Sequence, residues 1–219
     1  MPRATAPTDW AACERELAAG AAALGLELGT GVRARLLDYL AELANWNATH
    51  NLTAVREPRA MVARHLLDSL AVLEAVTGPR LADVGTGAGL PGLVIALARP
   101  EIAVTLIESS AKKAAFLRHV RRRLQLANVE VVRARVEAHA PATGFDCVIC
   151  RAFAAADDCL RLAGHLVGPG GRFLLMKGRD PAAELGALPP AFRHRETRAL
   201  TVPGLDAARH LVVLEPVRA

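Results

Sequence analysis

From residue 80 onward, short apolar runs alternate with segments of helical periodicity, and this alternation restricts the possible folds more than any other feature. Parallel strands need crossover connections, which are usually helices, so the pattern predicts an α/β fold with a mostly parallel sheet. Segments 193–202 and 209–215 have no helix between them and predict an antiparallel hairpin at the sheet edge. The expected strands are 81–84, 104–107, 129–132, 145–150, 172–176, 193–202 and 209–215.

The chain before residue 79 is expected to be helical, because apolar residues recur there at helical spacing and Pro58 suits the first position of a helix. The polar segment 47–53 predicts a loop. We expect residues 1–78 to pack as a helical segment on a core of residues 79–219, within one compact domain. The predicted N-terminal helices span 9–25, 30–46 and 58–76.

The charge balance favours an anionic partner. The formal net charge is +5 and the sequence pI is about 9.5, and nucleic acid is the first partner to consider for such a chain. Basic residues crowd the predicted helix at 111–126, where they are candidates for RNA phosphate contacts. A run of charges is equally typical of a solvated helix face, so both interpretations stay open. The basic residues of this helix are Lys112, Lys113, Arg118, His119, Arg121, Arg122 and Arg123.

Several features favour a cytoplasmic chain. No stretch approaches the roughly 20 apolar residues of a membrane helix, and the segment Met1–Trp10 lacks a signal-peptide pattern. Cys147 and Cys150 form a CxxC inside an apolar run that predicts a buried strand. Residues three apart on a strand face opposite sides, so we expect inert core thiols and no metal site.

The glycine-rich segment Asp83–Gly92 follows the first predicted strand. Glycines there let the backbone turn tightly and approach a ligand closely, and the turn after a parallel strand lies where such sheets bind ligands. Glu108 follows the second strand, about 20 residues further on, where a carboxylate accepts hydrogen bonds from ribose hydroxyls. We therefore predict a nucleoside cofactor at a site made of Asp83, Gly85, Gly87, Gly89 and Glu108.

Two cofactor classes fit this site. Residues 87–92 satisfy the G-x-G-x-x-G pattern of dinucleotide-binding domains, so an NAD-dependent oxidoreductase stays open. The alternating glycines, the glycine turn at 168–171 and the closing hairpin instead resemble S-adenosylmethionine-dependent methyltransferases. These three features favour S-adenosylmethionine over NAD.

Flanking segments extend the resemblance to one family. From about residue 35 to about residue 215, the chain resembles the ribosomal RNA small subunit methyltransferase G family, also called glucose-inhibited division protein B. Cys150 departs from the family pattern, which often has serine there. The matching segments are 51–56, 64–70, 84–92, 135–137, 151–153 and 177–178.

The resemblance implies a Rossmann-like class I methyltransferase fold with N-terminal helices. It also implies methyl transfer from S-adenosylmethionine to N7 of one guanine in 16S ribosomal RNA, offered as rRNA or within the small ribosomal subunit. We expect the chain to act as a monomer. Glu108 would hold the ribose. The implied cofactor contacts are Gly85, Leu90, Val136, Glu137 and Arg151.

The chemistry of this target agrees with the residues of the chain. N7 of guanine carries a lone pair and no proton, so the reaction needs no general base, and the enzyme's task is alignment and exclusion of water. The usual arginine fork on guanine takes both O6 and N7, but N7 must stay free here. We therefore expect a donor to O6 alone. The candidates for positioning the guanine are Arg151, Lys177, His65 and Asp68.

Other interpretations remain open at this point. His65 and Asp68, three residues apart, are also typical of a polar pair on a helix surface or at a helix-packing interface. Lys177 also fits a solvated strand end. A methyltransferase acting on a non-RNA substrate would use the same cofactor site, and a non-catalytic RNA-binding module would bind RNA without methyl transfer.

Overall fold

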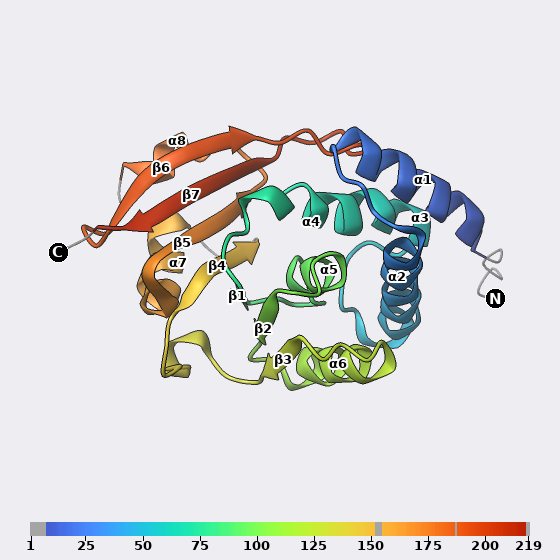
Figure 1. Cartoon of the computed structure of the whole chain (residues 1–219), viewed down its shortest axis with the longest axis horizontal. Helices are drawn as coiled ribbons and strands as arrows, with labels where there is room; N and C mark the ends of the chain where they lie inside the picture. Colours follow the sequence, from blue (N-terminus) through green and yellow to red (C-terminus); the bar gives the residue numbers. More distant parts are fainter. Residues whose placement is uncertain (1–7, 152–154, 187, 218–219) are drawn as a thin grey trace.

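The apolar runs form one sheet in a computed structural model that describes residues 8–151, 155–186 and 188–217. Within these residues the sheet has seven strands in the order β3-β2-β1-β4-β5-β7-β6 (Figure 1). The first five are parallel, and β7 pairs antiparallel with both β5 and β6, as predicted. The strands are β1 (Arg80–Val84), β2 (Ala103–Ile107), β3 (Val129–Val132), β4 (Phe145–Arg151), β5 (Val167–Lys177), β6 (Phe192–Ala199) and β7 (His210–Pro216).

Alternate strand residues enter two separate hydrophobic cores, one on each face of the sheet. On β4, Cys147 and Ile149 belong to one core, and Val148 and Cys150 belong to the other. The predicted opposite orientation of the two CxxC thiols is therefore confirmed, and the four cysteines are all buried and form no disulfide within the described residues.

The helices divide between the two faces of the sheet. The N-terminal helices, α5 and α6 cover one face, and α7 covers the other (Figure 1). The core on the first face includes residues from the N-terminal helices and from the sheet, such as Leu40 and Leu81, so one apolar core joins both parts of the chain. The sheet-flanking helices are α5 (Gly92–Ala98), α6 (Ala111–Arg123), α7 (Ala156–Ala163) and α8 (Ala182–Leu185).

The N-terminal helices differ in part from the prediction. The second helix continues to His50, so the prediction that 47–50 belong to a loop was wrong. The helix ends where Asn51 adopts a left-handed conformation with φ 48°, which an asparagine tolerates better than most residues. The third helix ends near Leu70 rather than Val76 and contains a π-helical segment. The helices are α1 (Trp10–Ala23), α2 (Thr30–His50), α3 (Pro58–Met61), the π segment η1 (Val62–Leu67) and α4 (Asp68–Leu70).

The sequence predicted that the glycines at 168–171 form a turn before the fifth strand. This prediction was wrong, because these glycines lie inside β5. A Cβ on Gly171 would come within 2.7 Å of the Phe145 carbonyl oxygen, and one on Gly168 within 3.1 Å of the backbone of Gly144. The pairing of β4 with β5 also shifts register between Phe145 and Cys147. These glycines therefore allow two strands to approach closely at an irregular pairing.

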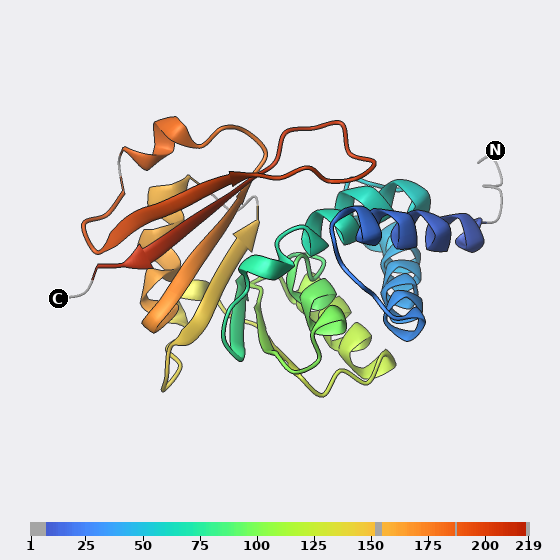
Figure 2. The same ribbon diagram turned by 45° about the horizontal axis from the view of Figure 1, so that its top comes forward.

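The connection between β6 and β7 extends away from the sheet and passes over the N-terminal helices (Figures 1 and 2). Val202 in this connection is buried in the shared core, and Pro203 and Gly204 face residues of α1 and η1 across a cavity. The connection thus brings the start of β7 next to α4. In the described part of the chain, no helix is long and apolar enough to span a membrane.

Candidate functional site

Two cavities lie at the carboxyl ends of the parallel strands, where an open α/β sheet binds its ligands. The larger has a volume of about 450 Å³ and is lined by the glycine loop, Leu90, Arg151, Lys177 and other residues. The smaller, of about 310 Å³, is lined by Glu108, Val136 and Glu137 among others. Gly85 and Lys113 border both cavities, so the two form neighbouring halves of one site.

Asp83 fixes the conformation of the glycine loop through hydrogen bonds. Its side chain is fully buried, and Oδ2 accepts hydrogen bonds from the Thr86 hydroxyl at 2.6 Å and from the Gly92 amide at 2.7 Å. Burial raises the pKa of this carboxyl to about 6. Asp83 lines neither cavity, although the sequence prediction placed it among the cofactor contacts, so its contribution is to hold the loop and the start of α5 in place.

The glycines of the loop have distinct surroundings. Gly85 and Gly87 border the larger cavity at φ 64° and 62°, and a Cβ on Gly87 would meet no atom closer than 3.9 Å. Gly89, at φ 96°, lines neither cavity, and a Cβ there would come within 2.3 Å of Leu93. Gly89 therefore permits close packing of loop and helix, while Gly85 and Gly87 leave room for a ligand.

Glu108 lies at the end of β2 with its carboxylate oriented by the backbone. Oε2 accepts from the Gly87 amide at 3.0 Å, and Oε1 accepts from the Ser110 amide at 2.8 Å. Each carboxylate oxygen has a second lone pair, which leaves acceptors for a further ligand. Glu108 lines the smaller cavity together with Val136 and Glu137.

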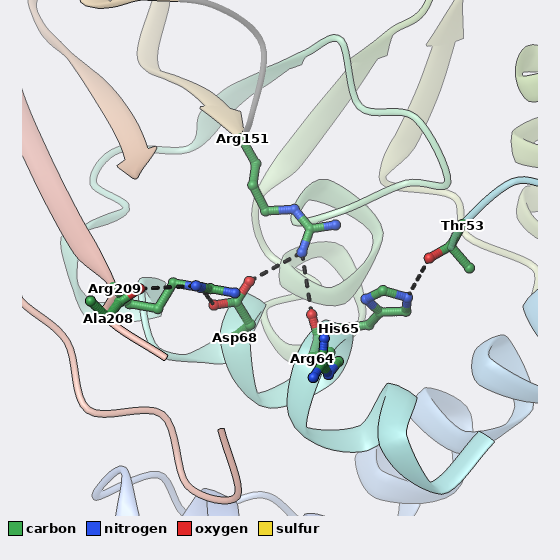
Figure 3. Close-up of polar contacts among 7 residues, drawn as sticks. All are labelled: Thr53, Arg64, His65, Asp68, Arg151, Ala208 and Arg209. Carbon is green, nitrogen blue, oxygen red and sulfur yellow. Dashed lines mark hydrogen bonds and ion pairs between the residues drawn. The ribbon is translucent and has the colours of Figure 1, made fainter. Parts of the chain in front are cut away.

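Asp68 connects two arginines at the wall of the larger cavity (Figure 3). Its side chain is 2% exposed, with Oδ2 at 3.1 Å from Nη1 of Arg151 and Oδ1 at 2.7 Å from Nε of Arg209. Arg151 Nη1 also lies 3.4 Å from the Arg64 carbonyl oxygen. Both Asp68 oxygens therefore hold arginines, and the two guanidinium groups face the cavity.

Sequence reasoning missed Arg209. It precedes β7, and the antiparallel pairing of β5 with β7 sets His210 beside Lys177, at the carboxyl end of β5. The residue before an antiparallel strand thus reaches the same edge of the sheet as the residues that follow parallel strands. The available signal was the basic residue at the first position of the last predicted strand, 209–215.

Lys177 lines the larger cavity, as expected for a residue of the site. Its ammonium group lies 2.7 Å from Oε2 of Glu184 at the end of α8, and this hydrogen bond lowers the pKa of Glu184. The same carboxylate oxygen accepts from the amide of Ala156. Lys177 is therefore tied to α8 and, through Glu184, to the start of α7.

His65 belongs to a separate network and does not pair with Asp68. Its Nε2 lies 3.0 Å from the hydroxyl oxygen of Thr53, which lines the larger cavity, whereas His65 itself does not (Figure 3). Both His65 and Asp68 are buried, one in the π-helical segment and one directly after it. The interpretation of these residues as a helix-surface pair is therefore wrong, whereas their burial agrees with polar side chains at a helix-packing interface.

Burial lowers the pKa of His65 from 6.5 to about 4, and this shift predicts a pH dependence of stability. A depressed folded-state pKa adds stability above pH 6.5, and this contribution is lost as the pH falls through about 4. We expect His65→Gln to flatten the fall in unfolding free energy between pH 6.5 and 4, measured by urea denaturation. Asp83 acts in the opposite direction, since its pKa is raised, but it is present in both proteins. Parallel curves for the two proteins would contradict this role of His65.

The two ends of the basic helix α6 lie at different distances from the site. It runs from the ligand edge of the sheet, where Lys113 borders both cavities, toward the opposite edge. At 1.5 Å per residue, Arg123 lies about 15 Å along the axis from Lys113. His119 and Arg123 also contact Glu42 of α2, at 2.7 and 3.5 Å. The predicted RNA patch on this helix thus has only its first residues beside the site.

The residues that the structure describes contain no group of three or more His, Cys, Asp or Glu side chains arranged to hold a metal ion.

Known proteins resemble this chain in sequence and in fold. A family model described as "GidB: rRNA small subunit methyltransferase G" matches residues 33–212. A "Ribosomal RNA small subunit methyltransferase G" of Nitrosospira multiformis is 53% identical, over 91% of this chain and 96% of that protein. A protein of the same name from Xanthomonas oryzae pv. oryzae is 48% identical, over 96% of this chain and 97% of its own length.

Solved structures agree on the fold. A predicted O-methyltransferase of Agrobacterium tumefaciens is 30% identical with a TM-score of 0.54, covering 68% of this chain and 79% of that one. TrmN of Thermus thermophilus has a TM-score of 0.55 at 24% identity, covering 71% and 53%. The fold, the glycine loop and the matches over most of the chain agree, and the chain belongs to the rRNA small subunit methyltransferase G family.

Proposed function

We propose that the chain transfers a methyl group from S-adenosylmethionine to N7 of a guanine in 16S ribosomal RNA. One observation carries the proposal: the cavity beside the Glu108 carboxylate adjoins, at Gly85 and Lys113, a second cavity walled by Arg151 and Arg209. A nucleoside methyl donor in the first cavity would thus direct its reactive end toward cationic side chains suited to RNA. Family membership supports methyl transfer over the NAD-dependent alternative.

The residues of the site fit S-adenosylmethionine. Glu108 would accept hydrogen bonds from the two ribose hydroxyls, Val136 and Glu137 would border the base, and Gly85 and Gly87 would allow close approach of the backbone. When bound, S-adenosylmethionine supplies a sulfonium methyl group, whose C–S bond breaks as the bond to N7 forms. Gly85, Leu90 and Arg151 would border its methionine end in the larger cavity.

The remaining task of the chain is alignment. No proton leaves N7 in this reaction, because the positive charge of the sulfonium passes to the base, so no side chain has to act as general base. Asp68 would serve by holding Arg151 and Arg209 rather than by accepting a proton. Alignment of sulfur, methyl carbon and N7 within the walled cavity, with water excluded, would supply the rate enhancement.

The proposed partner is 16S rRNA, either alone or within the small ribosomal subunit, and the proposed compartment is the bacterial cytoplasm, where both occur. We propose that the chain acts as a monomer.

Labelled methyl transfer tests the proposal. The purified chain and labelled S-adenosylmethionine would be incubated with rRNA, and separately with small subunits, from a strain lacking the family enzyme. We expect label at one guanine, recovered as 7-methylguanosine on nucleoside mapping. Transfer to another atom, to protein or to small molecules only would reject the RNA target, and binding of RNA without transfer would indicate a binding module.

The proposed chemistry also predicts a nearly flat pH–rate profile around neutrality. A reaction without a general base does not depend on the protonation state of a catalytic side chain. His65, with a pKa of about 4, also stays neutral across this range. Single-turnover rates from pH 6.5 to 8.5 with saturating donor would measure it. A steep rise governed by one apparent pKa near 7 would contradict the mechanism.

A further inference from the structure

We propose that the substrate RNA docks along a basic rim beside the smaller cavity and thereby covers the opening of that cavity during methyl transfer. The basic rim consists of Lys112, Lys113, Arg133 and Arg135. The inference rests on the proposed function and goes beyond it, because it states where the RNA next to the target guanine lies and how this RNA affects exchange of the cofactor.

The basic rim comes from the segments that follow β2 and β3. These strands are neighbours, and the Glu108 amide donates to the Val132 carbonyl at 3.1 Å, so the chain leaves β3 beside Glu108. Arg133 is the first residue after β3, and Lys112 and Lys113 lie in the first turn of α6. Because β3 is two strand spacings from β1, the distance between them is about 10 Å, which a few nucleotides of RNA can span.

The basic rim borders the opening of the smaller cavity. Three residues that line this cavity are exposed, namely Ser109, Arg135 and Glu137, and they mark the side on which it opens to solvent. Lys113 borders both cavities and joins the basic rim to the place where the guanine is proposed to enter. RNA that extends from the larger cavity to Arg133 would therefore cross the opening of the smaller one.

The cations of the basic rim have no partner among the described residues. None of the four side chains makes a hydrogen bond or an ion pair there, and Lys112, Arg133 and Arg135 are exposed. Of the two nearby acids, Glu108 is buried and bound by backbone amides, and Glu137 faces the smaller cavity. A group of exposed cations without carboxylate partners attracts an anionic ligand, and RNA phosphates supply the charge.

The opposite side of the site carries carboxylates. Arg161 of α7 contacts Asp157 and Asp158. Lys177 contacts Glu184 of α8 at 2.7 Å. Cations that are already paired attract phosphates less, and the carboxylates repel them. RNA that enters the larger cavity is therefore attracted more strongly toward β3 and α6 than toward α7 and α8.

Two matched double variants of the full chain test the basic rim. The rim variant, Lys112→Gln/Arg133→Gln, removes two exposed cations that line neither cavity. The far-end variant, Arg121→Gln/Arg122→Gln, removes two exposed cations at the other end of α6 and changes the net charge equally. The probe is 16S rRNA or the small subunit, whichever accepts the methyl group from the wild-type chain. Its affinity is measured by filter binding over a range of salt concentrations.

We expect the rim variant to bind the probe about tenfold more weakly than the wild type, with a salt slope smaller by about 1.5, the value of two lost phosphate contacts. The far-end variant should bind the probe like the wild type. Affinity for S-adenosylhomocysteine without RNA, measured by calorimetry, should be the same in all three proteins. Equal weakening of probe binding in both variants would mean that only net charge matters, and it would overturn the basic rim.

Release of S-adenosylhomocysteine tests whether RNA covers the cavity. Labelled S-adenosylhomocysteine is bound to the wild-type enzyme and chased with unlabelled compound, with and without a saturating amount of the probe. We expect the probe to slow release about tenfold, and to slow it less in the rim variant. An unchanged release rate in the wild type would overturn the proposal and needs no variant to fold. Failure of the proposed function has a different signature, because the wild type would then transfer no methyl group to RNA.

Discussion

Replacing Glu108 with alanine is expected to raise the dissociation constant for S-adenosylmethionine about 100-fold. Hydrogen bonds to a charged group contribute about 1.5–3 kcal/mol each, and the carboxylate is proposed to accept two from the ribose. The change also removes the acceptors of the Gly87 and Ser110 amides, which hold the loop on either side of the cofactor site. Calorimetric titration with S-adenosylmethionine and S-adenosylhomocysteine would measure the loss.

Glu130→Ala is the matched control, because Glu130 lies exposed on the neighbouring strand β3 and lines neither cavity. It should leave the affinity unchanged. A Glu108→Ala protein that is folded and binds the donor with wild-type affinity would remove Glu108 from the cofactor site, and with it the assignment of the smaller cavity to the nucleoside.

Replacing Asp68 with asparagine is expected to lower the unfolding free energy by about 3 kcal/mol and methyl transfer by about 100-fold. Removing one partner of a buried ion pair leaves an uncompensated charge, and here two arginines, each 24% exposed, lose the carboxylate between them. Their mutual repulsion would then displace both from the cavity wall. A misplaced group of this kind costs about two orders of magnitude in rate.

Urea denaturation and single-turnover transfer at saturating donor would measure the two effects. Asp38→Asn is the matched control, since Asp38 is exposed on α2 and should change neither quantity. Arg209→Gln should cost less stability than Asp68→Asn, because Asp68 then still pairs with Arg151. Wild-type activity in Asp68→Asn would contradict the role of Asp68 in holding the arginines.

Local patterns determined most of the architecture. Alternating burial along the strands, helical spacing and the glycine loop depend on near neighbours, so the parallel strands, the edge hairpin and the place of Glu108 after β2 followed from the sequence. The same reasoning failed at 47–50 and 168–171, where tertiary contacts overrode composition. A polar end of α2 is stabilised by its packing, and the glycines of β5 serve a close approach to β4.

The side-chain partners in the site were decided only by the tertiary structure. Asp68 and Arg209 are 141 residues apart, and Thr53 meets His65 because a loop and a π-helical turn face each other. Motifs indicated that His65, Asp68 and Arg151 belong to the site, but the pattern of partners depends on where distant elements pack. Periodicity and spacing report which face a residue occupies within its own element, and carry no information about which side chain of another element it will meet.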